Sequence, residues 1–201
     1  VTAEGDMLAA LGLRYGTDDA NNMINIIHKV LCQSVYSSSA QLAAQRGSFE
    51  IYNHELEKDN PFLKRLWKSD SILEERMIKY GRRNIACLTM APTGAISIMT
   101  HTTSGIEPVF KPIYKRRRKI NGDNDNAHVD FVDEVGDRYE EFLVIHPKFK
   151  VWMDINGYSL PDKPSQNEID KMVELSPYYK ATANDIDWIS KVHMQGMIQK
   201  W

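Results

Sequence analysis

The chain has 201 residues, of which 42% are apolar and 26% are charged, a balance typical of a globular protein and unlike that of a disordered or fibrous one. Its 25 Lys and Arg residues and 27 Asp and Glu residues give a formal net charge of −2, which argues against nucleic acid or an anionic membrane surface as the partner. No apolar run in the sequence approaches the roughly 18 residues that a membrane-spanning helix requires.

Two helices are expected in the first quarter of the chain. The first spans Thr2–Leu11, with its first residue as a candidate N-cap and Gly12 as the stop. The second is the clearest in the sequence, because Thr17 or Asp18 can cap it and Gly47 ends it. One face of this helix is marked by positions that recur at spacings of three and four: Met23, Ile26, Ile27, Val30, Leu31, Ser34 and Val35.

The middle of the chain is expected to contain a loop, a helix and a strand. Phe49–Pro61 is expected to be a loop or an irregular segment. Asp70–Tyr80 is expected to form a helix that Gly81 closes. Asn84–Met90 carries few charges and ends just before Pro92, which predicts a buried strand.

The next part of the chain begins with a second extended segment, Val109–Ile120, which Pro112 interrupts. Asn121–His128 is rich in Asn, Asp and Gly and is expected to form a turn. We expect a helix at Val129–Ile145, because its large apolar residues fall on one side of a helix. These residues are Phe131, Val132, Val135, Tyr139, Phe142 and Leu143.

Two further helices are expected at the end of the chain, after one short helical piece and a loop. They span Gln166–Leu175 and Asn184–Trp201, the second with a cap at Asn184 and an acidic first turn at Asp187. The whole sequence then holds five or six helices and about two strands. Two strands do not make a stable sheet alone, so the fold is either mostly helical or contributes strands to a larger sheet.

The two cysteines, Cys32 and Cys87, lie far apart and form no CxxC pair. Two cysteines in a chain of this length do not make a disulfide scaffold, so we expect a reducing, cytoplasmic compartment. The chain starts at Val1 with an acidic segment that does not resemble a signal peptide, and it ends abruptly at Trp201. These ends favour a piece cut from a longer chain.

The segment "APTGAIS", Ala91–Ser97, has the layout of an anion site. A strand, a Pro-Thr-Gly turn and a helix start bring unpaired backbone N–H groups together, and small residues let a phosphate approach them. Thr93 and Ser97 can add hydroxyl donors. The alternative is a Pro turn with capping hydroxyls and no ligand, since the glycine content is too low for a P-loop.

The longer stretch "APTGAISIMTHTTSGIEPVF", followed by "YKRRRKI", closely resembles the catalytic subunit of ribonucleotide reductase, and most closely the adenosylcobalamin-dependent (class II) type. That family's pattern reads roughly A-P-T-G-[TS]-I-S and then S-S-G-I-E-P. The resemblance covers most of the chain and is most specific at Gly81–Lys119. Further segments resemble other parts of the family sequence: "DMLAALGLRY", "VDEVGDRYEEF", "ELSPYYKATANDIDW" and "MQGMIQKW".

The resemblance implies an α/β fold, in which residues 1–201 form one helix-rich fragment of a ten-stranded α/β barrel, with two to four strands and a phosphate-loop region at 84–108. It implies reduction of ribonucleoside diphosphates by a cysteine thiyl radical, with adenosylcobalamin in the parent enzyme. The implied partners are the substrate and the remainder of the reductase chain, while a homo-oligomer stays open. The residues implied to bind the substrate diphosphate are Pro92, Thr93, Gly94, Ala95 and Ile96, with Ser97 just behind.

Two departures from the family pattern limit what this chain can do. Ala95 stands where the family has Thr or Ser, so one hydroxyl contact to phosphate is missing. The family's radical cysteine lies in an N-x-C-x-E loop, and the sequence contains no such loop. Cys32 and Cys87 are therefore interpreted as small buried hydrophobes. We expect no catalytic residue in this chain, which is then inactive in isolation.

The other charged and polar residues can be explained without a functional role. The basic run Lys115–Lys119 suggests either nucleic-acid contact or the solvated edge of a strand. The slightly negative net charge of the chain favours the strand edge. The family resemblance implies that the arginines of this run balance carboxylates such as Glu107. The six histidines show no metal-ligand spacing, and Glu140 and Glu141 resemble solvated charges on a helix face. A different hypothesis for the whole chain is a helical scaffold that folds or oligomerises without any ligand site.

Overall fold

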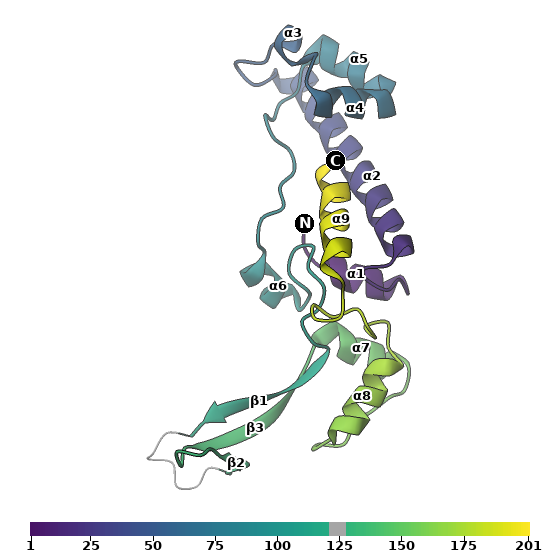
Figure 1. Ribbon diagram of the computed structural model, residues 1–201. Helices are drawn as coiled ribbons and strands as arrows, with labels where there is room; N and C mark the ends of the chain where they lie inside the picture. The colour runs from purple at the N-terminus through teal and green to yellow at the C-terminus, as the bar shows by residue number, and fades with distance from the viewer. Residues whose placement is uncertain (121–127) are drawn as a thin grey trace. The chain divides into compact units, whose positions relative to one another are not determined.

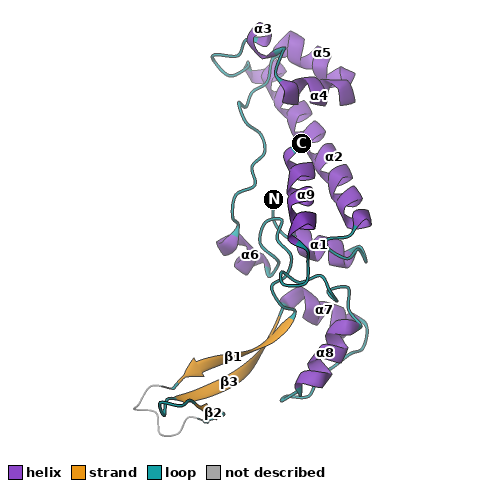
Figure 2. Ribbon diagram, viewed as in Figure 1, coloured by secondary structure: helices purple, strands orange, loops and turns teal. Residues whose placement is uncertain are grey.

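The structure is a computed structural model that describes residues 1–120 and 128–201. Residues 121–127, which hold most of the predicted turn cluster, lie outside the described residues. The described ranges contain nine helices and three strands (Figures 1 and 2). They divide into two compact units: unit 1 comprises Val1–Tyr15 and Pro92–Ile186, and unit 2 comprises Gly16–Ala91 and Asp187–Trp201.

Unit 2 is built on the long helix α2 (Asp18–Arg46). The Thr17 hydroxyl caps it by accepting a hydrogen bond from the Ala20 amide at 3.4 Å, and the chain leaves the helix at Gly47, where φ is 80°. Both ends agree with the prediction. The predicted apolar face of this helix was wrong, because Ile26 and Val30 are each 55% exposed. The helix buries a different face, which carries Ile24, Cys32 and Tyr36. No helix in the described part of the chain is long and apolar enough to cross a membrane.

The other helices of unit 2 are short. The predicted helix at Asp70–Tyr80 is α5 (Ser71–Tyr80), which the Asp70 carboxylate caps. The prediction of a loop over Phe49–Pro61 was wrong in part, because Asn53 and Asn60 cap two helices there. The remaining helices are α3 (His54–Glu57), α4 (Pro61–Ser69) and α9 (Trp188–Gln199).

An apolar cluster fills the space where α2 packs against α4 and α5. Each helix contributes residues at helical spacing, so the buried stripes meet. The buried members are Cys32, Tyr36, Ala40, Leu63, Leu66, Trp67, Leu73 and Met77. The interpretation of Cys32 as a buried hydrophobe is confirmed, because its side chain is fully buried in this cluster.

The prediction of a buried strand at Asn84–Met90 was wrong. This segment is irregular, and Ile85 is 64% exposed. An apolar run becomes a strand only where another strand takes its backbone hydrogen bonds, and the described residues of unit 2 contain no strand. Ser39 on α2 holds its start instead, since its hydroxyl accepts from the Asn84 amide and donates to the Asn84 side chain, both at 3.0 Å.

One buried cation lies just before this segment. Arg82 is 6% exposed and forms a two-point ion pair with Glu57, of which the Nη2–Oε1 contact measures 2.8 Å. Its guanidinium also donates to the carbonyl groups of Asn84 and Ile85 and lies 5.2 Å from the centre of the Phe49 ring. These contacts supply the hydrogen bonds that a buried guanidinium needs.

Unit 1 contains the three-stranded antiparallel sheet, in the order β1-β3-β2 (Figure 1). The strands are β1 (Ile113–Lys119), β2 (Phe131–Val132) and β3 (Arg138–Ile145). The extended segment predicted after Val109 is therefore confirmed from Ile113 onward. The helix predicted at Val129–Ile145 was wrong, because this segment turns back at Gly136, where φ is 88°, and pairs with β1.

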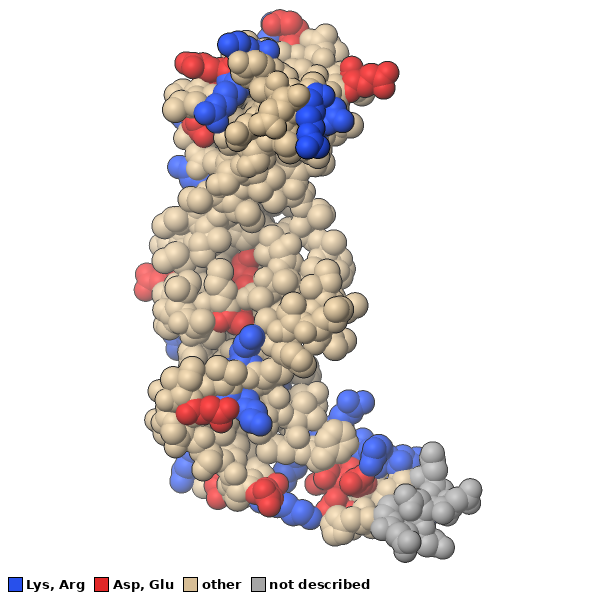
Figure 3. Space-filling view, turned by 180° about the vertical axis from the view of Figure 1, so that it is seen from behind, with Lys and Arg blue, Asp and Glu red and all other residues tan. Residues whose placement is uncertain are grey.

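The basic run lies on β1, an edge strand, and its last three residues form ion pairs with acidic residues of β3 and of the turn before it. Arg117 pairs with Glu141 at 2.8 Å and Arg118 with Glu140 at 2.6 Å, while Lys119 pairs with Asp137. Figure 3 shows blue and red side chains intermixed on the surface next to the grey atoms. The glutamates lie on a strand instead of the predicted helix face, and they take the place expected for Glu107 as partners of the arginines.

Four helices complete unit 1: α1 (Glu4–Ala10), α6 (Gly94–Thr100), α7 (Pro147–Ile155) and α8 (Gln166–Glu174). Helices α1 and α8 match predictions, and Ser165 caps α8 in a capping box with Glu168. Thr2 was predicted to cap α1, but Ala3 occupies that position without a side-chain cap. The apolar core of this unit is formed by Ala9, Val109, Ile113, Phe149, Met153, Ile169 and Tyr178.

Candidate functional site

The predicted phosphate residues, Pro92–Ser97, form the turn into α6, and we refer to them as the candidate loop. Thr93 is the N-cap, and its carbonyl accepts the first helical hydrogen bond, from the Ser97 amide at 2.8 Å. The structure therefore brings all six residues together at one helix start, as the sequence pattern indicated. Ser97 is buried, whereas Pro92, Gly94, Ala95 and Ile96 are exposed.

Three backbone donors are available at this helix start. Among the described residues, no acceptor is recorded for the amide N–H groups of Gly94, Ala95 and Ile96. The first turn of any helix leaves such groups without an intrahelical partner, and their dipoles favour an anion. A Cβ added to Gly94 would meet no described atom within 4 Å, so the approach to these amides is open.

The two predicted hydroxyl donors have partners inside the protein. The Thr93 hydroxyl accepts a hydrogen bond from the Gly105 amide at 2.7 Å and donates to the Thr2 hydroxyl at 3.0 Å. The Ser97 hydroxyl donates to the Gly94 carbonyl at 2.8 Å. Both side chains hold the shape of the candidate loop, which leaves the backbone amides as its exposed donors.

The segment Thr2–Asp6, here called the N-terminal clamp, holds the loop that follows α6. The Ala3 amide donates to the Thr103 carbonyl at 3.1 Å, and the Thr103 amide donates to the Asp6 carboxylate at 2.8 Å. Sequence reasoning assigned only a short helix to this region. No local pattern predicts a contact between residues 97 positions apart, so the clamp was missed.

Asp6 is the centre of a buried polar network. Its side chain is 6% exposed, and Oδ1 accepts from the Tyr178 hydroxyl and from His146 Nε2, both at 2.8 Å. Because a carboxylate oxygen accepts, Nε2 of His146 carries the hydrogen in this contact. Burial and the neighbouring Asp6 carboxylate raise the pKa of the Tyr178 hydroxyl well above its ordinary value, so Tyr178 remains a hydrogen-bond donor.

Two cavities of unit 1 share walls with this network. One, of about 530 Å³, lies between α1 and α7 and is lined by Asp6, Trp152 and Tyr178. The other, of about 480 Å³, is lined by Thr103, Glu107 and His146 and by neighbouring residues. Both volumes suit a small molecule.

Neither cysteine has the features of a reactive thiol. Both are free, and burial raises the pKa of Cys32 to about 11 and also raises that of Cys87. Such thiols are mostly protonated at neutral pH and weakly nucleophilic. The part of the chain that the structure describes contains no group of three or more His, Cys, Asp or Glu residues placed to hold a metal ion.

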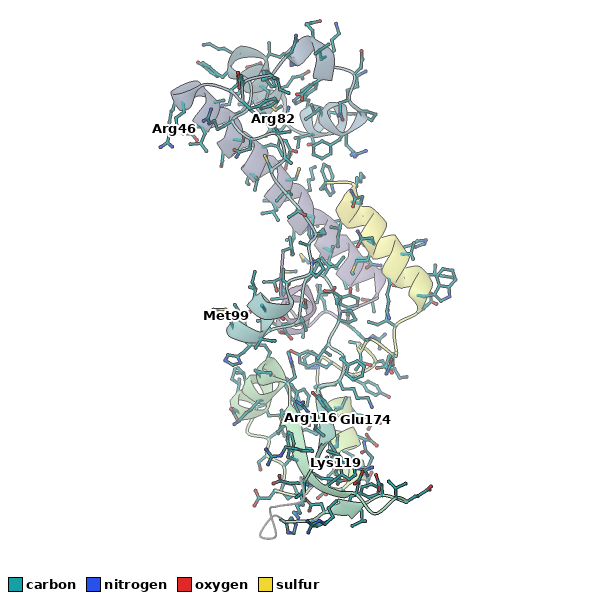
Figure 4. The ribbon with its side chains drawn as sticks, turned by 90° about the vertical axis from the view of Figure 1, so that its left-hand side faces the viewer. Arg46, Arg82, Met99, Arg116, Lys119 and Glu174 are labelled. Atoms are coloured by element: carbon teal, nitrogen blue, oxygen red, sulfur yellow. The ribbon has the colours of Figure 1, made fainter. Side chains whose placement is uncertain are left out.

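The outward face of α6 is apolar. Ile96 is 53% exposed, Ile98 75% and Met99 81%, and Figure 4 shows the Met99 side chain pointing away from the helix. Three neighbouring exposed apolar side chains on one short helix are uncommon on a surface that faces only water, and such surfaces often mark a contact with another protein segment.

Comparison with known proteins gives matches along the whole chain. The family model described as "Ribonucleotide reductase, barrel domain" matches residues 1–201. A vitamin B12-dependent ribonucleoside-diphosphate reductase of Mycobacterium tuberculosis is 30% identical over 112 residues, which are 55% of this chain and 13% of that protein. A vitamin B12-dependent ribonucleotide reductase of Rhodopirellula baltica is 31% identical over 130 residues, 52% of this chain and 12% of that protein. The aligned part is thus a small fraction of these relatives' length.

Proposed function

The chain belongs to the ribonucleotide reductase barrel-domain family, and we propose that it supplies the loop that binds the substrate diphosphate in a ribonucleoside-diphosphate reductase. In this proposal the candidate loop holds the charged end of a ribonucleotide that is reduced to a deoxyribonucleotide. The helices and the sheet form part of the ten-stranded barrel, and residues 1–201 are one fragment of it. The names of both relatives specify vitamin B12, and that of the Mycobacterium tuberculosis relative also specifies ribonucleoside diphosphates, which supports this assignment.

The observation that carries the proposal is the set of exposed amides at Gly94, Ala95 and Ile96. Three N–H groups at one helix start match the several oxygen acceptors of a phosphate and need no side-chain cation. Ala95 contributes through its backbone, so the missing hydroxyl weakens the site without removing it. Thr93 and Ser97 fix the loop from within.

The described residues do not fit the cobalamin cofactor that the relatives' names imply. The cavities of about 530 and 480 Å³ are sized for a small molecule, and a corrin macrocycle with its nucleotide tail is far larger. When bound in the parent enzyme, this cofactor generates the radical. In this proposal the residues of the present chain bind and orient the substrate.

The radical chemistry belongs, in this proposal, to a longer chain. The sequence lacks the N-x-C-x-E loop, and Cys32 is fully buried with a raised pKa. The exposed apolar face of α6 then packs against the remainder of that chain. The isolated 201-residue chain is expected to bind a ribonucleoside diphosphate weakly and to reduce none.

The test is titration of the chain with cytidine diphosphate, followed through the NMR signals of the Gly94, Ala95 and Ile96 amides. Gly94→Val should abolish binding, because its side chain covers the amides while the surroundings leave room for it. Gly196→Val is the matched control, since Gly196 also lies in a helix with no described atom near its Cβ. Equal binding by both variants contradicts the proposal and favours a scaffold without a ligand site.

A second pair of variants tests the position that departs from the family pattern. Ala95→Thr restores the missing hydroxyl and should tighten diphosphate binding by roughly tenfold, the effect of one hydrogen bond to a charged group. Ala95→Val has nearly the same shape without the hydroxyl and should not tighten it. Cytidine, which lacks phosphate, should bind none of these proteins measurably through the candidate loop.

A further inference from the structure

The candidate loop is held in place by the N-terminal clamp. The Ala3 amide donates to the Thr103 carbonyl at 3.1 Å, and the Glu4 amide donates to the Gly105 carbonyl at 3.3 Å. In return the Thr103 amide donates to the Asp6 carboxylate at 2.8 Å. The two segments therefore exchange hydrogen bonds in both directions, which fixes their register as firmly as a short ladder.

The clamp lies very close to the segment it holds. A Cβ added to Gly5 would lie 2.8 Å from the Glu107 carbonyl oxygen and 3.2 Å from Pro108 Cα. Both neighbours are backbone atoms, which cannot swing aside as a side chain can. Gly5 thus allows an approach that no other residue type permits.

Thr93 joins the clamp to the candidate loop. Its hydroxyl accepts from the Gly105 amide at 2.7 Å and donates to the Thr2 hydroxyl at 3.0 Å. The Thr2 hydroxyl in turn donates to the Thr103 carbonyl at 3.2 Å. Thr93 is the N-cap of α6, so anything that moves its side chain also moves the first turn and its amides.

Asp6 anchors the clamp at its other end. The donors to its carboxylate come from three separate segments: the Thr103 amide, the Tyr178 hydroxyl and His146 Nε2. Tyr178 belongs to the apolar core of unit 1, and it fixes the position of Asp6. A contact path then runs from this core through Asp6, Thr103 and Gly105 to Thr93.

We propose that Thr2 and Asp6 are positioning residues for the substrate diphosphate, because they hold Thr93 and with it the free amides of Gly94, Ala95 and Ile96. This inference rests on the proposed function of the candidate loop. A shift of the donors by about 1 Å is enough to weaken an oriented contact strongly. The two residues act through Thr93 and do not touch the substrate.

The principal variant is Asp6→Asn, which keeps the size of the side chain. An amide has one acceptor oxygen and one NH₂ group. If the oxygen faces Tyr178 and His146, the NH₂ group opposes the Thr103 amide, and the clamp loses its hold on that loop. We expect cytidine diphosphate binding to weaken by about tenfold, and the Gly105 amide to exchange its hydrogen faster.

The chain offers a matched control in Asp133→Asn. Asp133 also accepts three hydrogen bonds, two at Oδ1 from the Val135 and Asp137 amides and one at Oδ2 from the Tyr139 hydroxyl. It lies in the turn between β2 and β3, outside the candidate loop and the clamp. This variant should destabilise its own turn and leave both diphosphate binding and Gly105 exchange unchanged.

A gentler variant protects the test if Asp6→Asn fails to fold. Thr2→Val removes only the hydroxyl that links Thr93 to Thr103, whereas Thr2→Ser keeps it. We expect weaker binding by several-fold for Thr2→Val and recovery for Thr2→Ser. If Thr2 only fills space, Thr2→Ser, which is smaller, should not bind cytidine diphosphate more tightly than Thr2→Val.

The outcomes separate this inference from the proposed function. If the unchanged chain binds no diphosphate, but Asp6→Asn still shifts the Gly94 and Ala95 amide signals and speeds Gly105 exchange, positioning of the loop holds and the proposed function fails. If Asp6→Asn and Thr2→Val match Asp133→Asn in both binding and exchange, the positioning role is overturned. The positioning role is supported if Asp6→Asn and Thr2→Val lose diphosphate binding while Asp133→Asn keeps it.

Discussion

Different kinds of contact stabilise two regions of the molecule, the apolar cluster of unit 2 and the candidate loop of unit 1. In unit 2, α2, α4 and α5 meet around an apolar cluster in which Leu66 and Met77 are fully buried. In unit 1, the candidate loop is held by hydrogen bonds from the N-terminal clamp, with Asp6 and Thr93 at the two ends. Apolar packing tolerates small shifts, whereas a polar network has one good geometry. Apolar packing therefore suits the cluster of unit 2 as a scaffold, and a polar network suits the candidate loop of unit 1, whose amides must be oriented.

The largest effect should come from the apolar side of this comparison. Leu66→Ala leaves a cavity in the cluster and should lower the free energy of unfolding by about 3 kcal/mol. Urea denaturation followed by circular dichroism measures the change. Ile78→Ala, at a position on α5 that is 55% exposed, should alter it by less than about 1 kcal/mol. Equal losses would show that the cluster does not stabilise unit 2.

Arg82 tests whether unit 2 also depends on a polar contact. Arg82→Met leaves the Glu57 carboxylate, which is 24% exposed, without its partner and should destabilise the protein by about 3 kcal/mol. Adding Glu57→Gln removes the orphaned charge and should recover part of that loss. Urea denaturation of the single and double variants measures both. A double variant no better than the single one contradicts this account.

Thr93 gives the corresponding test for unit 1. Thr93→Val removes the acceptor of the Gly105 amide, a partly buried group, and should lower the free energy of unfolding by about 2 kcal/mol. Thr93→Ser keeps the hydroxyl and should lose less than half as much. Thermal or urea unfolding of both variants checks the difference, which disappears if shape alone matters at this position.

The smallest effect is expected from acid, at the edge of the sheet. The Glu141 amide and then Lys163 hold the pKa of Asp130 down at about 2. Its folded pKa lies below the ordinary value, so its contribution is complete above about pH 4 and is lost as the pH falls through about 2. NMR titration of the carboxyl carbon measures this pKa. Asp130→Asn should remove this part of the acid dependence of unfolding. A measured pKa of Asp130 close to the ordinary value for an aspartate would contradict this account.

The sequence predicted the elements whose signals are local. Helices α2, α5 and α8 have polar N-cap residues, Thr17, Asp70 and Ser165, directly before their first turn. The helix start after Thr93 was also indicated by the Pro-Thr-Gly turn. These signals lie within a few residues of each other, so one segment is enough to interpret them.

Two elements were predicted wrongly because their state depends on distant residues. The apolar residues of Val129–Ile145 fit a helical stripe, but Arg117 and Arg118 of β1 lie opposite Glu141 and Glu140 and stabilise a strand. Asn84–Met90 has the composition of a buried strand and lacks a partner strand among the described residues of unit 2.

The candidate site was predicted in part for the same reason. The residues of the loop follow from its local pattern and from the family resemblance. The Thr93 hydroxyl contacts Thr2, 91 residues away, and Asp6 contacts Thr103, 97 residues away, so the roles of Thr2 and Asp6 depend on distant parts of the chain. The pattern of a single sequence does not show which distant residues come into contact in the fold.

The discontinuity of unit 1 has a consequence for the order of folding. The cluster of unit 2 uses residues between Cys32 and Met77, so it can form while the ribosome is still making the chain. Asp6 must wait for Tyr178, 172 residues later. A nascent chain released before Tyr178 is made would therefore carry a formed helical cluster and an N-terminal clamp without its Tyr178 anchor, and the loop amides would lack their final support.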